Sequence, residues 1–258
     1  MFGSLKSSPN EVRNMDVDVK EFLNQRRFIV LFSGGRDSLA TLLWVLDNID
    51  HDDWKILYIE VSGNTHPLCT EYVKRVCEAL GVKSKLLIDG REDADFFTCL
   101  RKWGVPLIGK YRWCLYQFKI KVIEKYKRYS LIYVSGVRRR DSWRRKGIEP
   151  IEFFRSSETV VVNPILNWSR RQVIEYIARH GVDVNPCYKI YGHSGNCMFC
   201  PYHTKEMIVL TLKDPEWGEK ILSSLTFKGR FSKKIAEKWV KLSRKVELQP
   251  LTYWIRGG

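Results

Sequence analysis

Short apolar runs and stretches of helical periodicity alternate along the first 180 residues of the chain. The runs are rich in β-branched and aromatic residues, as buried strands are, and span residues 28–32, 55–61, 84–88, 131–135 and 159–162. Between them, apolar positions at helical spacing predict helices at residues 39–46, 70–80, 93–103, 115–126 and 169–180. This alternation predicts an α/β fold, a doubly wound and mostly parallel sheet with helices on both faces.

Local signals outline the regions around this sheet. Ser169 is followed three residues later by Gln172, the pattern of a capping box at a helix start. Residues 11–27 are expected to form an N-terminal helix that covers the edge of the sheet. We predict an α/β domain over residues 1–180, followed over residues 181–258 by a cysteine-rich segment and a basic helical appendage.

The most informative stretch follows the first predicted strand and opens the first predicted helix. Its sequence is Ser33-Gly34-Gly35-Arg36-Asp37-Ser38. A strand that feeds a glycine-rich turn into a helix aims unpaired backbone N–H groups and the positive end of the helix dipole at one point. The two glycines allow close backbone approach, and the two serines add hydroxyl donors. An ordinary strand–turn–helix connection is the alternative, but this composition favours a phosphate ligand.

Two further strand ends would lie beside this loop in a parallel sheet. Residues 59–65 end the second predicted strand, where their backbone is well placed to hold an adenine ring. Glu60 either binds ribose or adenine or is simply a charge at the strand end. Gly136 ends the fourth predicted strand and precedes a run of cations. In that run, Arg138 and Arg145 would clamp phosphates or a leaving pyrophosphate, which planar guanidinium groups suit.

The seven cysteines do not show the pairing pattern of a secreted protein. Cys197 and Cys200 have the C-x-x-C spacing that brings two thiolates onto one metal, and Cys187 lies ten residues before Cys197. Cys114 is the candidate for a fourth thiolate. A redox dithiol is the alternative, but four such cysteines favour a metal centre. Thiolate ligation suits both zinc and an iron–sulfur cluster.

Basic residues outnumber acidic ones by 44 to 29, which gives a formal net charge of +15. The excess is concentrated between Lys110 and Lys146, where 13 basic residues accompany only Glu124 and Asp141. A solvated basic face would explain this, but a polyanionic partner is favoured because such a patch supplies phosphate contacts. No apolar run is long enough for a membrane span, and the N-terminus lacks an apolar signal core. We therefore expect a cytoplasmic protein that binds no membrane.

The stretch SGGRDS resembles the PP-loop of the ATP-pyrophosphatase superfamily, whose members open ATP between the α- and β-phosphates. Together with RWC, GVRRRDSWRR, PILNW, NPCY and GNCMFCP, it resembles the phosphoadenosine-phosphosulfate (PAPS) reductase-like branch over residues 28–203. The resemblance implies that nucleotide phosphates and Mg²⁺ are bound by Ser33, Gly34, Gly35, Asp37 and Ser38. It also implies phosphate or sulfate contacts from Arg138 and Arg145. It favours a [4Fe–4S] cluster over zinc, held by Cys114, Cys187, Cys197 and Cys200.

The candidate residues therefore form three groups. The candidate catalytic residues are Asp37, Ser38, Arg138 and Arg145. The candidate cofactor-binding residues are Ser33, Gly34, Gly35, Arg36, Asp37, Ser38, Glu60 and Gly136. The candidate metal ligands are the four cysteines that the resemblance implies.

Departures from the family pattern argue against reductase chemistry. Sulfonucleotide reductases degrade this phosphate loop, because they bind a monophosphosulfate and split no ATP, whereas SGGRDS is intact here. Those reductases also use a nucleophilic cysteine in a C-terminal tail, and no cysteine follows Cys200. Cluster-bearing reductases often have adjacent cysteines at the first ligand position, whereas Leu115 follows Cys114.

We therefore expect an enzyme that binds Mg-ATP at residues 33–38, adenylates an acceptor oxygen and releases pyrophosphate. Sulfur from a donor would then displace AMP, with support from an iron–sulfur cluster. The basic surface makes RNA, especially tRNA, or DNA the expected acceptor. Two alternatives stay open: a PAPS or adenylyl-sulfate reductase that forms sulfite, and a nucleic-acid-binding module stabilised by zinc. The oligomeric state is also open, a homodimer included.

Overall fold

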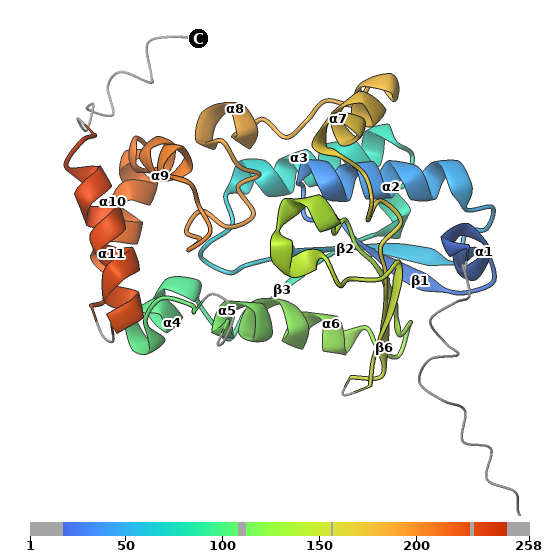
Figure 1. Ribbon diagram of the computed structural model, residues 1–258, viewed down its shortest axis with the longest axis horizontal. Helices are drawn as coiled ribbons and strands as arrows, with labels where there is room; N and C mark the ends of the chain where they lie inside the picture. Colours follow the sequence, from blue (N-terminus) through green and yellow to red (C-terminus); the bar gives the residue numbers. More distant parts are fainter. Residues whose placement is uncertain (1–17, 108–111, 156, 228–229, 247–258) are drawn as a thin grey trace, which may run out of the picture.

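A six-stranded sheet forms the centre of the computed structural model, which describes residues 18–107, 112–155, 157–227 and 230–246 (Figure 1). The strands lie in the order β3-β2-β1-β4-β6-β5. All neighbouring strands pair in parallel except β5, which runs antiparallel to β6. The predicted fold class is therefore confirmed. The strands are β1 (Phe28–Leu31), β2 (Trp54–Glu60), β3 (Leu86–Gly90), β4 (Ile132–Val134), β5 (Ile151–Phe154) and β6 (Thr159–Val162).

Helices cover both faces of this sheet. α2, α3 and α7 lie over one face, and α5 and α6 lie over the other (Figure 1). The helices are α1 (Val19–Asn24), α2 (Arg36–Asn48), α3 (Pro67–Ala79), α4 (Phe96–Trp103), α5 (Trp113–Leu115), α6 (Lys121–Lys125), α7 (Arg170–Arg179), α8 (Cys187–Tyr191), α9 (Lys205–Leu212), α10 (Pro215–Ser224) and α11 (Arg230–Ser243). Single turns of other helix types are η2 (Lys83–Lys85), η3 (Tyr116–Ile120), η4 (Arg139–Asp141) and η5 (Trp143–Arg145).

The side chains of the central strands alternate between two apolar cores. Phe28 and Val30 of β1 belong to the large core that includes residues of α2 and α3. Ile29, which lies between them, packs with Val122 and Tyr133 on the opposite face. Because helices cover both faces, the strand carries apolar side chains in both directions. This is why β1 is an unbroken apolar run in the sequence.

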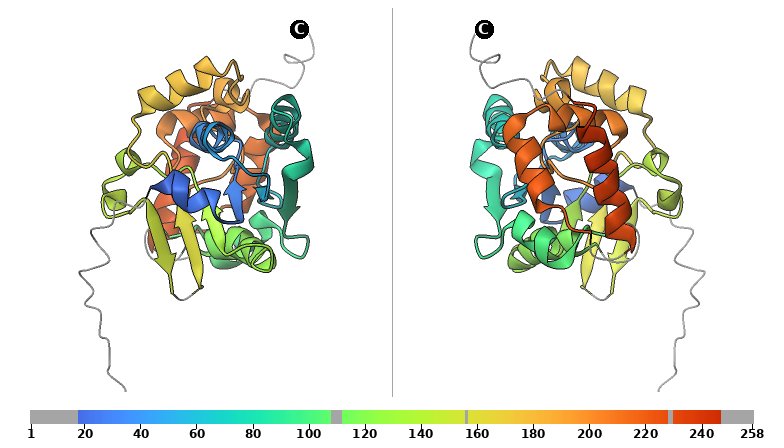
Figure 2. Two further views of the ribbon diagram at one scale, coloured as in Figure 1. Left: turned by 90° about the vertical axis from the view of Figure 1, so that its right-hand side faces the viewer. Right: turned by 90° about the vertical axis from the view of Figure 1, so that its left-hand side faces the viewer.

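The C-terminal helices α9, α10 and α11 pack at the end of the molecule that also holds α4 (Figures 1 and 2). Trp239 of α11 is fully buried, and its ring centroid lies 5.0 Å from that of Phe199. Lys238 Nζ donates a hydrogen bond to the carbonyl oxygen of His203 at 2.9 Å. These contacts fasten α11 to the cysteine-rich segment, so the C-terminal helices support that segment.

Capping residues explain where two of the helices begin. Ser169 Oγ accepts a hydrogen bond from the Gln172 backbone N–H, and the Gln172 side chain accepts one from the Ser169 N–H, so the predicted capping box at α7 is confirmed. Helix α3 begins at Pro67, three residues before the predicted start. There, His66 Nδ1 accepts a hydrogen bond from the Leu68 N–H at 3.1 Å, and proline suits the first helical position.

Two features of the fold differ from the sequence predictions. Strand β5 was not predicted, because it is an edge strand whose Phe153 and Phe154 are exposed and which therefore lacks the pattern of a buried run. The N-terminal helix was predicted over residues 11–27, of which 11–17 lie outside the described residues. Helix α1 makes hydrogen bonds with the connection between α2 and β2 rather than with an edge strand. In the described ranges, no helix is long and apolar enough to cross a membrane.

Candidate functional site

The loop of residues 33–38 leaves β1 at the carboxyl edge of the sheet and enters α2. Gly34 has a φ of +73°, a left-handed conformation that residues with a side chain rarely adopt. Gly35 is the N-cap of α2 and supplies no side-chain cap for the N–H groups of the first turn. The dipole of this 13-residue helix adds partial positive charge at the same point. The loop therefore has the geometry of an anion-binding site.

Two serines hold the loop in this shape. Ser38 Oγ donates a hydrogen bond to the Gly35 carbonyl oxygen at 2.9 Å and accepts one from the Ser33 N–H at 3.2 Å. The two serine hydroxyl oxygens lie 3.1 Å apart. Ser38 is buried, whereas Ser33 is partly exposed. Ser38 therefore stabilises the turn, and Ser33 is the hydroxyl that is more accessible to a ligand.

Two glycines allow neighbouring segments to approach this loop closely. A Cβ atom on Gly34 would lie 2.9 Å from Cys69 Sγ on α3. A Cβ atom on Gly136, at the end of β4, would lie 2.8 Å from backbone atoms of Asp37 and Ser38. Such distances are shorter than those that real Cβ atoms show, so packing alone requires glycine at both positions. The carboxyl ends of β1 and β4 thus meet at the first turn of α2.

Alternating charges extend from this turn into the cationic segment after β4. Arg138 Nε donates to Asp37 Oδ1 at 2.8 Å, and Arg138 Nη2 lies 2.5 Å from Asp141 Oδ1. Arg145 Nη1 donates to Asp141 Oδ2 at 2.6 Å. Arg138 is only 6% exposed, and its two carboxylate partners compensate its buried charge. Of the two predicted phosphate-binding arginines, Arg138 therefore contacts the loop directly, and Arg145 is joined to Arg138 through Asp141.

The Asp37 carboxyl group experiences two opposing influences. Burial raises its pKa, whereas the Arg138 guanidinium lowers that pKa by its charge and its hydrogen bond. Asp141 raises the pKa of Asp37 further, and Arg145 lowers it. The net shift is upward, which means that the charged form of Asp37 depends on its arginine neighbours.

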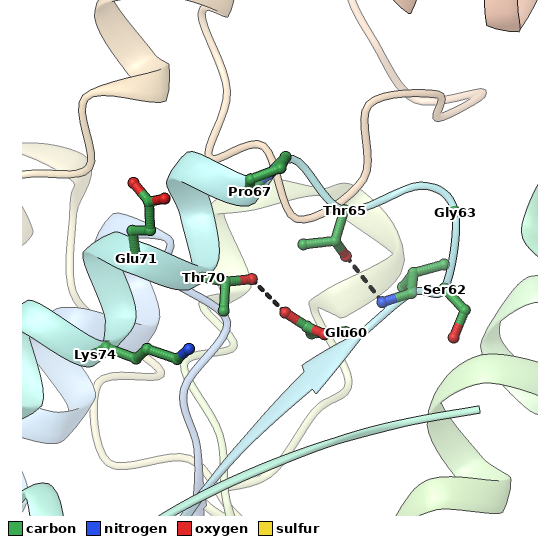
Figure 3. A pocket seen from close by; sticks show the side chains of 9 residues that line it. Glu60, Ser62, Gly63, Thr65, Pro67, Thr70, Glu71 and Lys74 are labelled. Atoms are coloured by element: carbon green, nitrogen blue, oxygen red, sulfur yellow. Dashed lines mark hydrogen bonds between the residues drawn. The ribbon is translucent and has the colours of Figure 1, made fainter. Parts of the chain in front are cut away.

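A cavity of about 350 Å³ opens where β2 ends and α3 begins (Figure 3). Glu60 and Thr70 point toward one another at its wall, and the Thr70 hydroxyl donates to the Glu60 carboxylate. The Val61 N–H is already bonded to Thr65 Oγ1 at 2.8 Å. Five of the seven residues 59–65, whose backbone was predicted to hold adenine, line this cavity. It lies at the end of β2, the strand that pairs with β1. A role of Glu60 toward ribose or adenine stays a prediction.

Three of the four predicted metal ligands, Cys114, Cys197 and Cys200, are near enough to influence one another electrostatically. Burial raises the thiol pKa of Cys114 and of Cys200, and the neighbouring Cys197 raises both further. Lys119 lowers both of these pKa values, and Arg112 lowers that of Cys114. The three thiols thus share one electrostatic environment, with cations at its rim.

Cys187 lies apart from these three thiols. It is fully buried, and its Sγ would be 2.8 Å from a Cβ atom on Gly195. Burial and the nearby Cys69 raise the pKa of its thiol to about 12. Among the described residues, no group of three or more His, Cys, Asp or Glu side chains is placed to hold a metal ion. The four cysteines therefore do not form one ligand set in this structure.

Two residues near the loop were missed in the sequence. Tyr188 and Asn185 belong to the same NPCY stretch that indicated Cys187. Tyr188 Oη accepts a hydrogen bond from the Arg36 N–H at 3.3 Å, and Asn185 Nδ2 donates to the Gly34 carbonyl oxygen at 3.1 Å. About 150 residues separate the partners, and neither a tyrosine nor an asparagine in a loop is a signal for such a contact. Only the fold shows it.

The open, mostly parallel sheet with a glycine-rich anion loop at its carboxyl edge defines a nucleotide-binding α/β protein. Within that class, residues 27–201 match the sequence profile of the phosphoadenosine phosphosulfate reductase domain. The match covers more than half of the chain. The protein therefore belongs to the PAPS reductase domain family, as its motifs predict.

Two other proteins match about two thirds or more of this chain. Over 200 residues it is 26% identical to an uncharacterised protein of Methanocaldococcus jannaschii, an alignment covering 74% of this chain and 40% of that protein. Over 181 residues it is 25% identical to an uncharacterised 37.8 kDa protein of Escherichia phage 186, covering 66% of this chain and 50% of the relative. The chain thus spans half or less of the length of these two relatives.

A solved structure supports the fold. The phosphate complex of a PAPS reductase from Candida auris matches with a TM-score of 0.50 at 18% sequence identity. The match covers 72% of this chain and 94% of the reductase chain.

The contact at Gly136 leads to a first prediction. Gly136→Ala is expected to lower the free energy of unfolding by about 1–3 kcal/mol, because a methyl group would meet the backbone of Asp37 and Ser38. It should also weaken nucleotide binding, because the same backbone forms the loop. Urea unfolding and calorimetric titration with a non-hydrolysable ATP analogue measure both effects.

Gly147→Ala is the matched control, since nothing lies within 4 Å of a Cβ atom at that position. It should change the free energy of unfolding by no more than about 0.5 kcal/mol. Equal stability and equal affinity in the two variants would show that Gly136 does not support the loop.

Proposed function

We propose that this protein binds ATP at residues 33–38 and adenylates an acceptor oxygen, with release of pyrophosphate. The acceptor oxygen forms a bond to the α-phosphorus while the bond from that phosphorus to the bridging oxygen breaks. Pyrophosphate leaves with the electron pair of the broken bond. The acceptor is a nucleic acid, either RNA (tRNA in particular) or DNA, and adenylation prepares it for attack by sulfur from a donor.

The observation that carries this proposal is the first turn of α2 at the end of β1, which its N-cap residue Gly35 leaves without a side-chain cap. Backbone N–H groups, a helix dipole and the Ser33 hydroxyl converge there, and the N-cap Gly35 leaves room for phosphoryl oxygens. The neighbouring cavity at the end of β2, with a volume of about 350 Å³, is lined by backbone and polar groups that suit a nucleoside. Family membership over residues 27–201 is consistent with a nucleotide ligand.

Asp37 and Arg138 would divide the charge chemistry between them. The Asp37 carboxylate, exposed at 34% of its side chain, is available to the Mg²⁺ that accompanies a nucleotide triphosphate. Mg²⁺ would neutralise phosphate charge when bound. Arg138 is held by Asp37 and Asp141 at the edge of the loop, so its guanidinium is pre-oriented toward charge that develops on the leaving pyrophosphate.

A basic and aromatic surface begins beside this site. Arg140, Arg144 and Lys146 are exposed, and Trp143 is 75% exposed. They follow Arg138, which contacts the loop itself, within eight residues of the chain. Cations for the phosphate backbone and an aromatic ring for base stacking are what a single-stranded nucleic acid requires. The proposed acceptor would thus approach the nucleotide from the side of η4 and η5.

The metal centre is proposed on Cys114, Cys197 and Cys200, whose thiols influence one another electrostatically and would have to move closer together to bind one metal ion. Arg112 and Lys119 favour the thiolate form that a metal requires. An iron–sulfur cluster bound there would supply a place to hold a sulfur atom, and zinc is the alternative metal. A four-thiolate set with Cys187 would require that thiol to leave its contact with Gly195.

A sulfonucleotide reductase is the second candidate, because the matching family is named for that activity. It would form sulfite from PAPS or adenylyl sulfate with electrons from a thiol. The two reactions differ in their products, so one pair of assays separates them. Pyrophosphate release from ATP favours the adenylating enzyme, and thiol-dependent sulfite formation favours the reductase.

A second prediction tests the adenylating reaction. Asp37→Asn should lower pyrophosphate release from Mg-ATP by roughly 100-fold, because it removes the carboxylate available to the metal ion. Enzyme-coupled detection of pyrophosphate, with nucleic acid present, measures the rate. The control is Asp53→Asn. Asp53 is an exposed residue just before β2, at the amino end of the sheet, and it pairs with Arg27. Equal rates in the two variants would remove Asp37 from the mechanism.

A third prediction concerns the pH dependence of the same rate. Because Arg138 lowers the pKa of Asp37, Arg138→Gln should raise that pKa and move the acid limb of the rate profile to higher pH. Arg145 is a weaker influence on Asp37, so Arg145→Gln should move the limb by less. The variant should regain activity as the pH rises, provided that Asp37 acts as a carboxylate. An acid limb at the same pH in both variants would contradict this coupling.

A fourth prediction tests the metal centre. Protein purified without oxygen should contain iron and absorb at roughly 400 nm, as expected for an iron–sulfur centre. Cys197→Ser should lose the iron and the absorbance, whereas Cys99→Ser on α4, whose thiol is not among the three, should retain both. Stoichiometric zinc without iron in the wild type would reject the cluster.

A further inference from the structure

Helix α8 places Tyr188 directly over the phosphate loop. The Tyr188 hydroxyl oxygen accepts a hydrogen bond from the Arg36 N–H at 3.3 Å. The Arg36 guanidinium carbon lies 3.9 Å from the centre of the tyrosine ring, a cation–π contact. A Cβ atom on Gly35 would lie 3.4 Å from the same hydroxyl oxygen. Tyr188 therefore touches the loop with both its ring and its hydroxyl group.

The hydroxyl group of Tyr188 has a proton to donate. Its oxygen is an acceptor in the bond from Arg36, which leaves the O–H free to act as a donor. In the part of the chain that the structure describes, no protein acceptor is bonded to this O–H. A phenol keeps its proton at neutral pH, because its usual pKa is about 10. A donor is thus available at the point where the loop would bind phosphoryl oxygens.

Asn185 fastens the same segment to the loop. Its side chain is 1% exposed, and its Nδ2 donates to the carbonyl oxygens of Gly34 at 3.1 Å and of Ser194 at 2.8 Å. Its Oδ1 accepts a hydrogen bond from the Cys187 N–H at 2.9 Å. A single buried amide therefore connects the phosphate loop to both ends of the segment 187–194. Movement of this segment away from the loop would break the bond from Asn185 to Gly34 and leave the Gly34 carbonyl oxygen without this partner.

We infer that the Tyr188 hydroxyl donates a hydrogen bond to a phosphoryl oxygen of the bound nucleotide and thereby ties the cysteine-rich segment to the occupied loop. Tyr188 is then a nucleotide-binding residue that lies next to Cys187 in the chain. By linkage, a bound nucleotide stabilises the position of this segment in which Tyr188 contacts the loop. Loosening of the segment in turn weakens nucleotide binding. This inference rests on the proposed nucleotide site at residues 33–38.

Tyr188→Phe tests the inference because it keeps the ring over Arg36 and removes only the hydroxyl group. Titration calorimetry with α,β-methylene-ATP and with inorganic pyrophosphate gives the dissociation constants. Both constants should rise by about 10- to 100-fold, as expected for one hydrogen bond to a charged group. The control is Tyr202→Phe, since Tyr202 lies on the same cysteine-rich segment and is 48% exposed. It should leave both constants unchanged.

A second readout follows the segment itself. Cys187 is fully buried, so its alkylation by iodoacetamide requires local opening. Saturating α,β-methylene-ATP should slow this alkylation in the wild type and in Tyr202→Phe, and should slow it less in Tyr188→Phe. Mass spectrometry of the modified peptide measures the rates. A variant that merely packed less well would react faster with and without nucleotide, by the same factor.

The possible failures are distinguishable. Equal dissociation constants for pyrophosphate in the wild type and Tyr188→Phe would refute the hydrogen bond while leaving the proposed nucleotide site intact. Weaker binding with unchanged protection of Cys187 would refute the tie to the cysteine-rich segment. If the wild type binds neither probe, the proposed function fails, and the role of Tyr188 fails with it.

Discussion

The first turn of α2 lies so close to its neighbours that two of the contacts leave no room for a side chain. Gly136 meets the backbone of Asp37 and Ser38, and Gly34 meets the thiol of Cys69. The contact at Gly136 is backbone against backbone, which cannot adjust as a flexible side chain can, so it helps to fix the position of the loop. The direction of its N–H groups, and hence its capacity to hold an anion, depends on this packing.

Charge and hydrogen bonding converge on the same turn from distant parts of the chain. Arg138, from the segment after β4, is buried and pairs with both Asp37 and Asp141. Tyr188 and Asn185 approach from the cysteine-rich segment. The loop is therefore where the carboxyl edge of the sheet meets the cysteine-rich segment. The proposed coupling of adenylation to sulfur addition would use this junction.

Much of the fold could be predicted from local patterns, because burial on two faces leaves an unbroken apolar run and helix capping leaves a short polar pattern. The strand at Thr159–Val162 and the capping box at Ser169 were predicted residue by residue. Strand β5 was not, because an exposed edge strand is stabilised by pairing that has no apolar signature. The loop at 33–38 was recognisable because its glycines and serines follow a strand and form the tight turn that leads into α2.

The sequence by itself determined the class of sheet, the place of its glycine-rich loop and the membership of a family, since each depends on residues that are neighbours in the chain. Tertiary structure alone decided which distant groups meet there. It paired Arg138 with Asp37, set the Tyr188 hydroxyl on the Arg36 amide, and gathered Cys114 with Cys197 and Cys200 while Cys187 packed against Gly195. Spacing in a sequence constrains neighbours within a few residues. The pairings of Arg138 with Asp37, Tyr188 with Arg36 and Cys114 with Cys197 span 83 to 152 residues and depend on how helices and strands pack, which no local pattern records.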